Sequence, residues 1–483
     1  MPPNARTEGP AYRKELAKSP SRRNQGLWGV LPLLLRFASF GSDRGMYLPI
    51  QKIALAAGLL AFAACTSDSG KNEAPTAPAA AAKPRAAAAP VAPPKAPEAP
   101  AEPRREALSG GPYPTLVLSQ AQFVDKKGPD GRMMPAPGPA KLTIVRQTPE
   151  GWQTTILEDP ESNVFHKATA FGDGLLTIGG NKAMLKTWKM ENGAWTEEMH
   201  WNPTFGGRFN RLRDYEQGDV DNDGKDEIVI ATHDQGVIAI IHPDEDWRVE
   251  QIDALPNTFV HEIELGDVDG DGDLEAFATP SKPNKLDQHQ PGEVTGYRRS
   301  ADGTWVKEVV DAPGDTHAKE ILVADTDGDG KAEVFIVWEG AMDKGKLVRE
   351  VTIKQYRWNG ESWDGVVAQT LPDRLTRAIA AGDVTGNGKI DLVVGTQRSG
   401  LYLLEQSPEG WSKRHIDRAS SGFEHPVTLA DLDEDGTLEV YVASEDQNQL
   451  RQYTITDGRI SKKVVTRLAP GDITWNVDAV GLQ

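Results

Sequence analysis

The chain has 483 residues with 53 basic and 71 acidic side chains, for a formal net charge of −18. This acidic balance excludes a protein that grips nucleic acid through clustered Lys and Arg, so we expect no nucleic-acid partner. The single cysteine, Cys65, excludes a disulfide framework and a cysteine-based zinc site. The charge is also divided unevenly, because residues 1–112 carry 15 basic and 8 acidic side chains and residues 113–483 carry 38 and 63.

The first segment, residues 1–45, does not fit ahead of the export signal that follows it. We interpret it as a mis-called N-terminal extension, with Met46 as the true initiator. Residues 46–65 hold a short basic start at Lys52 and then an apolar run that is too short for a confident transmembrane helix. Such a run is typical of a secretory signal peptide.

The signal ends in Phe62-Ala63-Ala64-Cys65, which resembles a bacterial lipobox, although that family prefers Leu where this chain has Phe62. The resemblance implies lipidation of Cys65 and a bacterial membrane as a partner. Thr66 follows the cysteine where Asp would imply retention at the inner membrane. The resemblance therefore implies an exported lipoprotein of the outer membrane in a Gram-negative bacterium. A buried core cysteine is the alternative interpretation of Cys65.

Residues 66–112 consist mainly of Ala, Pro, Lys and Glu and contain no periodic apolar face. A segment of this composition cannot bury a core, so we predict a disordered, proline-stiffened linker. Its expected role is to hold the folded domain away from a bilayer.

An acidic motif repeats five times in residues 113–483. The motifs start at Asp219, Asp267, Asp325, Asp383 and Asp431, with spacings of 48, 58, 58 and 48 residues. A turn with Gly or Asp, usually beside a Trp, follows each motif, and the same marker occurs earlier at Gly151-Trp152 and Gly193–Trp195. Together these markers indicate seven units.

Each unit contains four short alternating runs separated by turn residues, a pattern that predicts four antiparallel strands. A repeated four-stranded unit of about fifty residues is typical of a β-propeller blade, and a solenoid is the competing interpretation. The first unit lacks the strand that precedes the acidic motif elsewhere, and the C-terminal run DITWNVDAVG supplies one. We therefore predict that residues 113–483 form an all-β, seven-bladed propeller of four-stranded antiparallel blades, closed by the C-terminal strand and expected to be a monomer.

The acidic motifs have the spacing of calcium-binding loops. In the third unit, carboxylates at positions 1, 3, 5 and 9 and a glycine at position 6 surround one point, which suits a hard cation that takes six to eight oxygens. An EF-hand would continue into a helix, whereas this motif runs into the apolar strand EIVIAT. Solvated acidic turns that bind nothing are the alternative.

These D-x-D-x-D-G-x-x-[DE] loops followed by apolar strands resemble FG-GAP or VCBS repeats, as in the propeller of integrin α-subunits. The resemblance implies about five structural Ca²⁺ sites, with a weaker one where Thr385 and Asn387 replace carboxylates; the second unit keeps only Asp173-Gly174 and is expected to be empty. The implied ligands are Asp219, Asp221, Asp223, Glu227, Asp267, Asp269, Asp271, Glu275, Asp325, Asp327, Asp329, Glu333, Asp383, Asn387, Asp391, Asp431, Asp433, Asp435 and Glu439.

No nucleophile elbow, zinc signature or phosphate-binding loop occurs in the chain. We therefore favour a non-catalytic, surface-anchored propeller with an adhesion or recognition role. The alternative is a propeller enzyme, such as a sugar lyase or dehydratase, acting at the central tunnel.

A second repeating position lies six residues before the first loop aspartate. It is occupied by Lys167, Arg213, His261, Lys319, Arg377 and His425. All six are basic or can become so, and the position opens the innermost strand at the end away from the acidic loop. We expect these side chains to ring one mouth of the tunnel and to bind an acidic glycan or a carboxylate of a protein partner. The alternative is that each fastens neighbouring blades by pairing with an acid, although adjacent residues of a regular strand point to opposite faces.

Overall fold

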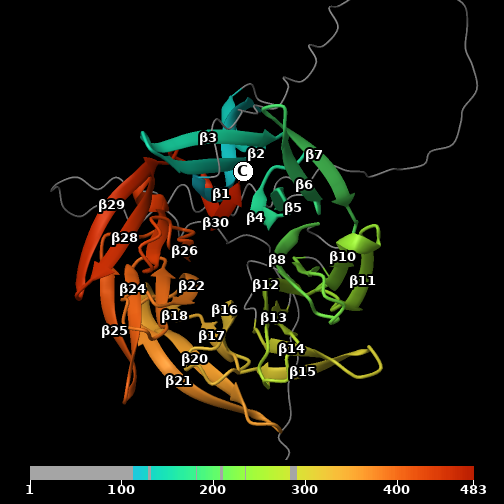
Figure 1. Cartoon of the computed structure of the whole chain (residues 1–483), viewed down its shortest axis with the longest axis vertical. Helices are drawn as coiled ribbons and strands as arrows, with labels where there is room; N and C mark the ends of the chain where they lie inside the picture. The colour runs from blue at the N-terminus through green and yellow to red at the C-terminus, as the bar shows by residue number, and fades with distance from the viewer. Residues whose placement is uncertain are drawn as a thin grey trace, which may run out of the picture. The chain divides into compact units, whose positions relative to one another are not determined.

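The computed structural model describes residues 113–128, 132–180, 182–206, 210–233, 235–282 and 291–482. The expected extension, signal peptide, lipidated Cys65 and linker lie outside these residues. The described residues form seven four-stranded antiparallel sheets arranged in a ring around a central axis (Figure 1). The predicted all-β, seven-bladed propeller is confirmed.

From the innermost strand outward, the blades follow the order of the chain except in the first. Blade 1 consists of β30 (Ile473–Leu482), β1 (Tyr113–Lys127), β2 (Met133–Thr148) and β3 (Gly151–Asp159); blade 2 of β4 (Phe165–Phe171), β5 (Gly174–Gly179), β6 (Leu185–Glu191) and β7 (Ala194–Trp201); and blade 3 of β8 (Leu212–Gly218), β9 (Glu227–Thr232), β10 (Ile238–His242) and β11 (Arg248–Asp253). Blade 4 consists of β12 (Phe259–Gly266), β13 (Glu275–Ser281), β14 (Val294–Arg299) and β15 (Trp305–Asp311), and blade 5 of β16 (Ala318–Ala324), β17 (Glu333–Trp338), β20 (Val351–Trp358) and β21 (Trp363–Leu371). Blade 6 consists of β22 (Thr376–Gly382), β23 (Asp391–Thr396), β24 (Leu401–Ser407) and β25 (Gly410–Asp417), and blade 7 of β26 (Val427–Ala430), β27 (Glu439–Ser444), β28 (Gln449–Thr456) and β29 (Arg459–Arg467).

The C-terminal strand closes the ring. β30 pairs antiparallel with β1, from Tyr113 opposite Leu482 to Ala121 opposite Ile473, and lies against the innermost strands β4 and β26 of the two neighbouring blades. At the outer side of the same junction, Trp152 of blade 1 packs edge-on against Tyr441 of blade 7, with ring centroids 6.3 Å apart. Closure by the last strand is thus confirmed, and it removes the free edge that an open array would leave.

The hydrophobic core lies between the blades. The second strands of blades 2 to 7 (β5, β9, β13, β17, β23 and β27) are buried at every residue, because neighbouring blades cover both of their faces. The outermost strands are buried much less, as in β15 and β21. The Trp of each predicted turn marker reaches back to the preceding blade: Trp363 meets Phe277 at 5.7 Å and Trp411 meets Phe335 at 5.7 Å.

The two longer repeat spacings come from insertions. In blade 5 a small hairpin of β18 (Ala341–Asp343) and β19 (Lys346–Arg349) stands between β17 and β20. In blade 4 the added residues lie between β13 and β14. The helices of the described residues are two short 3-10 turns, Pro243–Glu245 and Glu445–Gln447, and neither is long and apolar enough to cross a membrane.

Candidate functional site

The five acidic loops join the innermost strand of blades 3 to 7 to the second strand of the same blade. The ninth residue of each loop is the first residue of that second strand: Glu227, Glu275, Glu333, Asp391 and Glu439. Because the same strand connection carries each loop, all five lie at the same end of their blades.

The backbone of each loop folds around its first aspartate. The carboxylate of that aspartate accepts the N–H of the glycine at position 6 in all five loops, over 2.8 Å in blade 3 and 2.6 Å in blade 6. The residues at positions 4 and 6 have positive φ in every loop, for example Asn222 at 62° and Gly224 at 87°. Glycine at position 6 therefore suits a left-handed conformation that side chains disfavour.

The carboxylate at position 9 is the buried member of each loop. In four loops it accepts the backbone N–H of position 2, as Glu275 does from Val268 over 3.1 Å. Burial raises the pKa of Glu275 to about 7 and that of Asp391 to about 6. A cation bound in the loop would favour the ionised form of these groups.

The loop oxygens are close enough to share one ion. In blade 7, Asp431, Asp433, Asp435 and Glu439 each place a carboxylate oxygen within 4.8 Å of the others, and the first three aspartates of blades 3 and 4 do the same. Clustered carboxylate oxygens are the donors that calcium prefers. The residues therefore fit a divalent cation with oxygen ligands.

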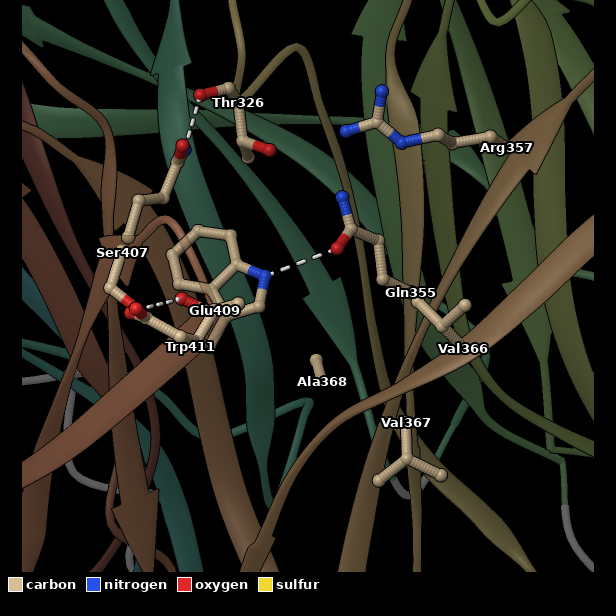
Figure 2. A pocket seen from close by; sticks show the side chains of 11 residues that line it. Thr326, Gln355, Arg357, Val366, Val367, Ala368, Ser407, Glu409 and Trp411 are labelled. Carbon is tan, nitrogen blue, oxygen red and sulfur yellow. Dashed lines mark hydrogen bonds between the residues drawn. The ribbon is translucent and has the colours of Figure 1, made fainter.

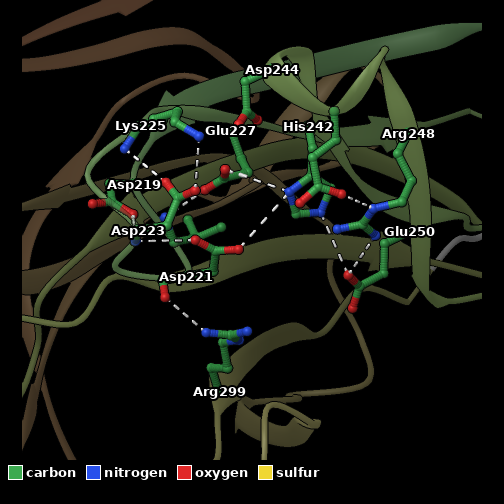
Figure 3. Close-up of polar contacts among 12 residues, drawn as sticks. Asp219, Asp221, Asp223, Lys225, Glu227, His242, Asp244, Arg248, Glu250 and Arg299 are labelled. Atoms are coloured by element: carbon green, nitrogen blue, oxygen red, sulfur yellow. Dashed lines mark hydrogen bonds and ion pairs between the residues drawn. The ribbon is translucent and has the colours of Figure 1, made fainter.

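Three loops also contact a basic side chain from the third strand of their own blade, a feature that the sequence analysis missed. In blade 3, Nδ1 of His242 lies 3.5 Å from Glu227 and 4.0 Å from Asp221 (Figure 3). In blade 4, Arg298 pairs with Asp269 and, over 2.9 Å, with Glu275.

Blade 5 repeats the arrangement, with Arg357 2.5 Å from Asp327 and 2.9 Å from Glu333. Among the described residues, no such ion pair reaches the acids of the blade 7 loop. The five loops thus divide into those that meet a protein cation and those that do not.

The loops of blades 6 and 2 depart from the pattern as the sequence suggested. In blade 6, Thr385 donates to Asp391 over 3.0 Å, so a hydroxyl takes the place of one carboxylate. In blade 2, β4 and β5 are joined by the two residues Gly172 and Asp173, and Asp173 pairs with Lys189 over 3.1 Å.

The second candidate site is a cavity of about 200 Å³ in the central tunnel, lined by side chains from or next to all seven innermost strands. Of the six predicted basic residues, Lys167, Arg213, His261, Lys319 and Arg377 line it. The lining also includes residues that the sequence analysis did not select, among them His166, Glu424 and Trp475.

His425 does not lie where it was predicted. It is fully buried and does not line the cavity; its Nδ1 lies 2.9 Å from the carbonyl of Thr396 and its Nε2 2.7 Å from Oγ of Ser420. The innermost strand of blade 7 starts only at Val427, so the counted position falls before the strand. The preceding residue, Glu424, lines the cavity instead.

Lys167 is also out of register. A β-bulge precedes it and puts His166 at the position that Arg213, Lys319 and Arg377 occupy at the bulges of their own blades. Lys167 pairs with Asp214, over 3.1 Å, and with Glu216 of the next blade. Lys167 therefore joins blade 2 to blade 3 through ion pairs, which was the alternative interpretation of this position.

The same bulges overturn the expectation that adjacent acids are badly placed to pair. Nζ of Lys319 lies 3.0 Å from Oε1 of Glu320, and Nδ1 of His261 lies 3.5 Å from Oε1 of Glu262. The register shifts at both positions, so the strict alternation of a regular strand does not apply there. Bulges cannot be read from residue spacing alone.

Within this cavity, two cations converge on one imidazole nitrogen. Nε2 of His261 accepts from Nη2 of Arg213 over 2.6 Å and from Nζ of Lys319 over 2.5 Å. Burial and then these two cations hold the pKa of His261 well below its usual value. The same causes lower the pKa of His166 and that of His317, to about 3. The imidazoles are therefore neutral beside these cations.

His261, Glu262 and Glu320 also bring ligand atoms within 4.8 Å of one another. A divalent metal ion does not fit this group well, because the single acceptor of the imidazole already faces Arg213 and Lys319. The charges next to these residues suit an anion better than a cation.

A larger cavity of about 380 Å³ lies on the loop side between blades 5 and 6 (Figure 2). Its polar groups are used in joining the two blades: Nε1 of Trp411 donates to Gln355 over 3.1 Å, and Gln406 donates to the carbonyl of Thr326 over 2.5 Å. We therefore interpret this cavity as part of the packing interface between blades 5 and 6; Trp411 is the Trp of the turn that recurs in the repeats.

Comparison with known proteins supports the repeat assignment. The family model described as FG-GAP-like repeat matches residues 219–278. This stretch is an FG-GAP-like repeat. It runs from the acidic loop of blade 3 to the second strand of blade 4, and the resemblance inferred from the loops is confirmed there. No curated protein matches the chain.

Solved structures with a similar arrangement include a candidate 6-phosphogluconolactonase of Bacteroides fragilis, 14% identical with a TM-score of 0.46, covering 76% of this chain and 98% of that one. A periplasmic gluconolactonase of Pseudomonas aeruginosa is 12% identical with a TM-score of 0.44, covering 77% and 99%. Similarities this weak carry no argument about function.

Proposed function

We propose that this protein is a non-catalytic, calcium-stabilised propeller that binds an anionic ligand at the mouth of its tunnel. The observation that carries the proposal is the convergence of Arg213 and Lys319 on Nε2 of His261. Two like charges held against one neutral ring in a confined site repel each other, and an anion placed between them would relieve that repulsion. Arg377 of the next blade lines the same cavity.

The acidic loops supply the second part of the proposal. In the absence of a cation, the carboxylates of a loop repel one another, so calcium would stabilise the loop that links the first two strands of a blade. The loops and the tunnel mouth lie at opposite ends of the innermost strands. Calcium would therefore support the scaffold without competing for the ligand.

Binding is favoured over catalysis by the state of His261. A general base needs a free lone pair within reach of its substrate. The acceptor nitrogen of His261 is engaged by Arg213 and Lys319, and the nearby carboxyls Asp214 and Glu262 accept the backbone N–H groups of Ile263 and Ile321. These groups hold neighbouring blades together.

The proposal includes an anchored location. The lipobox-like end at Cys65 and the Ala/Pro-rich segment that follows it support an exported lipoprotein that displays the propeller at a membrane. The corresponding test is Cys65→Ala, which should move the protein from the membrane fraction to the soluble fraction or leave it unprocessed. Unchanged membrane fractionation would contradict the anchor.

The test of ligand binding uses the full chain on arrays of acidic glycans and acidic peptides. We expect the Arg213→Ala/Arg377→Ala double variant to lose binding, while the rise in melting temperature that calcium produces stays the same as in the wild type. Arg248→Ala is the matched control, because Arg248 is an exposed cation on the outermost strand of blade 3. Binding retained by the double variant would refute the tunnel mouth as the ligand site.

A further inference from the structure

The charged side chains of the tunnel form two layers. Cations at the bulge positions form the outer layer, with Arg213, Lys319 and Arg377 as its members. Carboxyls follow one residue further along the innermost strands, at Asp214, Glu262 and Glu320 of blades 3 to 5. A ligand entering past the cations would therefore meet carboxyl groups next.

The charge balance of the cavity favours a ligand with one negative charge. The lining contains four cations and five carboxyl groups: Lys167, Arg213, Lys319, Arg377, Asp214, Glu262, Glu264, Glu320 and Glu424. Burial, together with neighbouring carboxylates, raises the pKa of Glu262 and that of Glu264 well above the usual value, which favours their neutral forms. Lys167 and Lys319 already pair with carboxylates, whereas Arg213 and Arg377 have no short ion pair among the described residues. One added carboxylate can meet these two arginines, and the remaining carboxylates of the lining would repel a second negative charge.

Arg377 lines the cavity without a short polar contact to any described residue. Its side chain is 7% exposed, Nε has no hydrogen-bond partner among the described residues, and its ion pair with Glu424 is long at 3.8 Å. A buried guanidinium with unmet donors is costly unless a partner arrives. Oδ1 of Asn476, which lines the same cavity, likewise lacks a donor within the described part of the chain.

The carboxyl layer offers both donors and acceptors. A neutral Glu264 can donate, and Oε1 of Glu320 and Oδ1 of Asn476, which accept no hydrogen bond from the described residues, can accept; this mixture suits hydroxyl groups, which do both. Two aromatic rings lie beside the cations, with Arg213 5.5 Å from the ring centre of Trp475 and Arg377 5.1 Å from that of Phe423. A peptide carboxylate brings no hydroxyls to such a surface, whereas a sugar acid does.

We propose that the tunnel binds a single sugar-acid unit end-on, with its carboxylate among Arg213, Lys319 and Arg377 and its hydroxyls on the carboxyl layer beneath. The cavity of about 200 Å³ is below the usual volume of sites for drug-sized ligands, about 300–1,000 Å³, and so suits one small unit. This inference rests on the proposed function and narrows it to an acidic glycan.

The experiment is calorimetric titration of the full chain with D-glucuronate, D-glucose, D-glucose 6-phosphate and a short peptide with a free C-terminal carboxylate. We expect glucuronate to bind about tenfold more tightly than the others, a difference of about 1.4 kcal/mol. The reason is that glucose lacks the carboxylate, the peptide lacks the sugar hydroxyls, and the phosphate carries a second negative charge. Arg377→Gln should weaken glucuronate about tenfold, and the exposed control Arg248→Gln should not. Lys319→Met is the second variant if Arg377→Gln lowers the melting temperature.

The outcomes separate the two proposals. If the phosphate or the peptide binds at least as tightly as glucuronate, and Arg377→Gln removes that binding, the sugar-acid inference is wrong and the anion site stands. If glucose binds equally well, the charge argument is wrong. If none of these probes binds, the sugar-acid inference is overturned, and the array comparison then decides the anion site independently.

Discussion

The two ends of the innermost strands carry repeated charges of opposite sign and are built in different ways. At one end, each acidic loop gathers its carboxylates from nine consecutive residues, and its backbone N–H groups satisfy the first aspartate directly. At the other end, the tunnel mouth takes its cations from separate blades, and bulges decide which residue faces the axis. A site built from consecutive residues can be predicted even when the strand register is assigned one residue off, whereas a site shared among blades cannot.

Removing the closing strand should have the largest effect on both ends. Deleting residues 472–483 removes the buried side chains of Ile473, Val477 and Val480, each worth about 1.5–3 kcal/mol, and opens an edge on β1. That loss is comparable with a whole stability of about 5–15 kcal/mol, so we expect aggregation or a collapse of the melting temperature. A truncated protein that melts like the full chain would show that the ring does not depend on closure.

Chelation should affect the loop end alone. Saturated calcium sites stabilise by about 2.7 kcal/mol each at a hundredfold excess over Kd, so excess chelator should lower the melting temperature by several degrees. Asp431→Asn should remove more of this shift than Asp383→Asn, because the blade 7 loop has four acids together and the blade 6 loop has Thr385 and Asn387. An unchanged melting curve in chelator would refute structural calcium.

Acid should act through the buried imidazoles near the mouth. Burial lowers the pKa of His425 to about 4, whereas the unfolded chain titrates near 6.5. The unfolded state then binds the proton first, so this group's contribution is fully present above pH 6.5 and is lost as the pH falls toward 4, on the order of 3 kcal/mol. Urea unfolding should show a flatter pH slope for His425→Gln than for the wild type between pH 7 and 5; equal slopes would contradict this assignment.

The smallest effect concerns the protein cations at the loops. Arg298→Met should lower the metal-free melting temperature slightly and enlarge the shift that calcium produces, because Asp269 and Glu275 lose a competing partner. The comparison variant is Arg248→Met, an exposed cation that pairs with Glu245 and Glu250 and not directly with an acid of a loop. A calcium shift that does not change in Arg298→Met would show that the guanidinium and the ion do not compete.

Much of the fold was predictable because its signals are local. The acidic motifs and the turn markers with Trp predicted seven units, and the alternating runs predicted four strands in each, since the hydrophobic period of two lies within one short strand. The run DITWNVDAVG predicted closure. The third-strand cations His242, Arg298 and Arg357 were missed, because strand pairing brings them to loops that lie 15 to 30 residues away in the chain.

By itself, the sequence determined the blade number, the acidic loops and a supply of basic residues at the start of the innermost strands. Only the tertiary structure decided which of those residues meet in the tunnel. In blades 2 and 1, bulges place His166 and Trp475 at the strand position that Arg213 and Lys319 occupy in their own blades. His425 lies outside the cavity because β26 starts only at Val427. Lys167 forms ion pairs with Asp214 and Glu216 of the next blade. The physical reason is that one extra residue in a strand redirects a side chain while leaving the hydrophobic pattern of the blade intact.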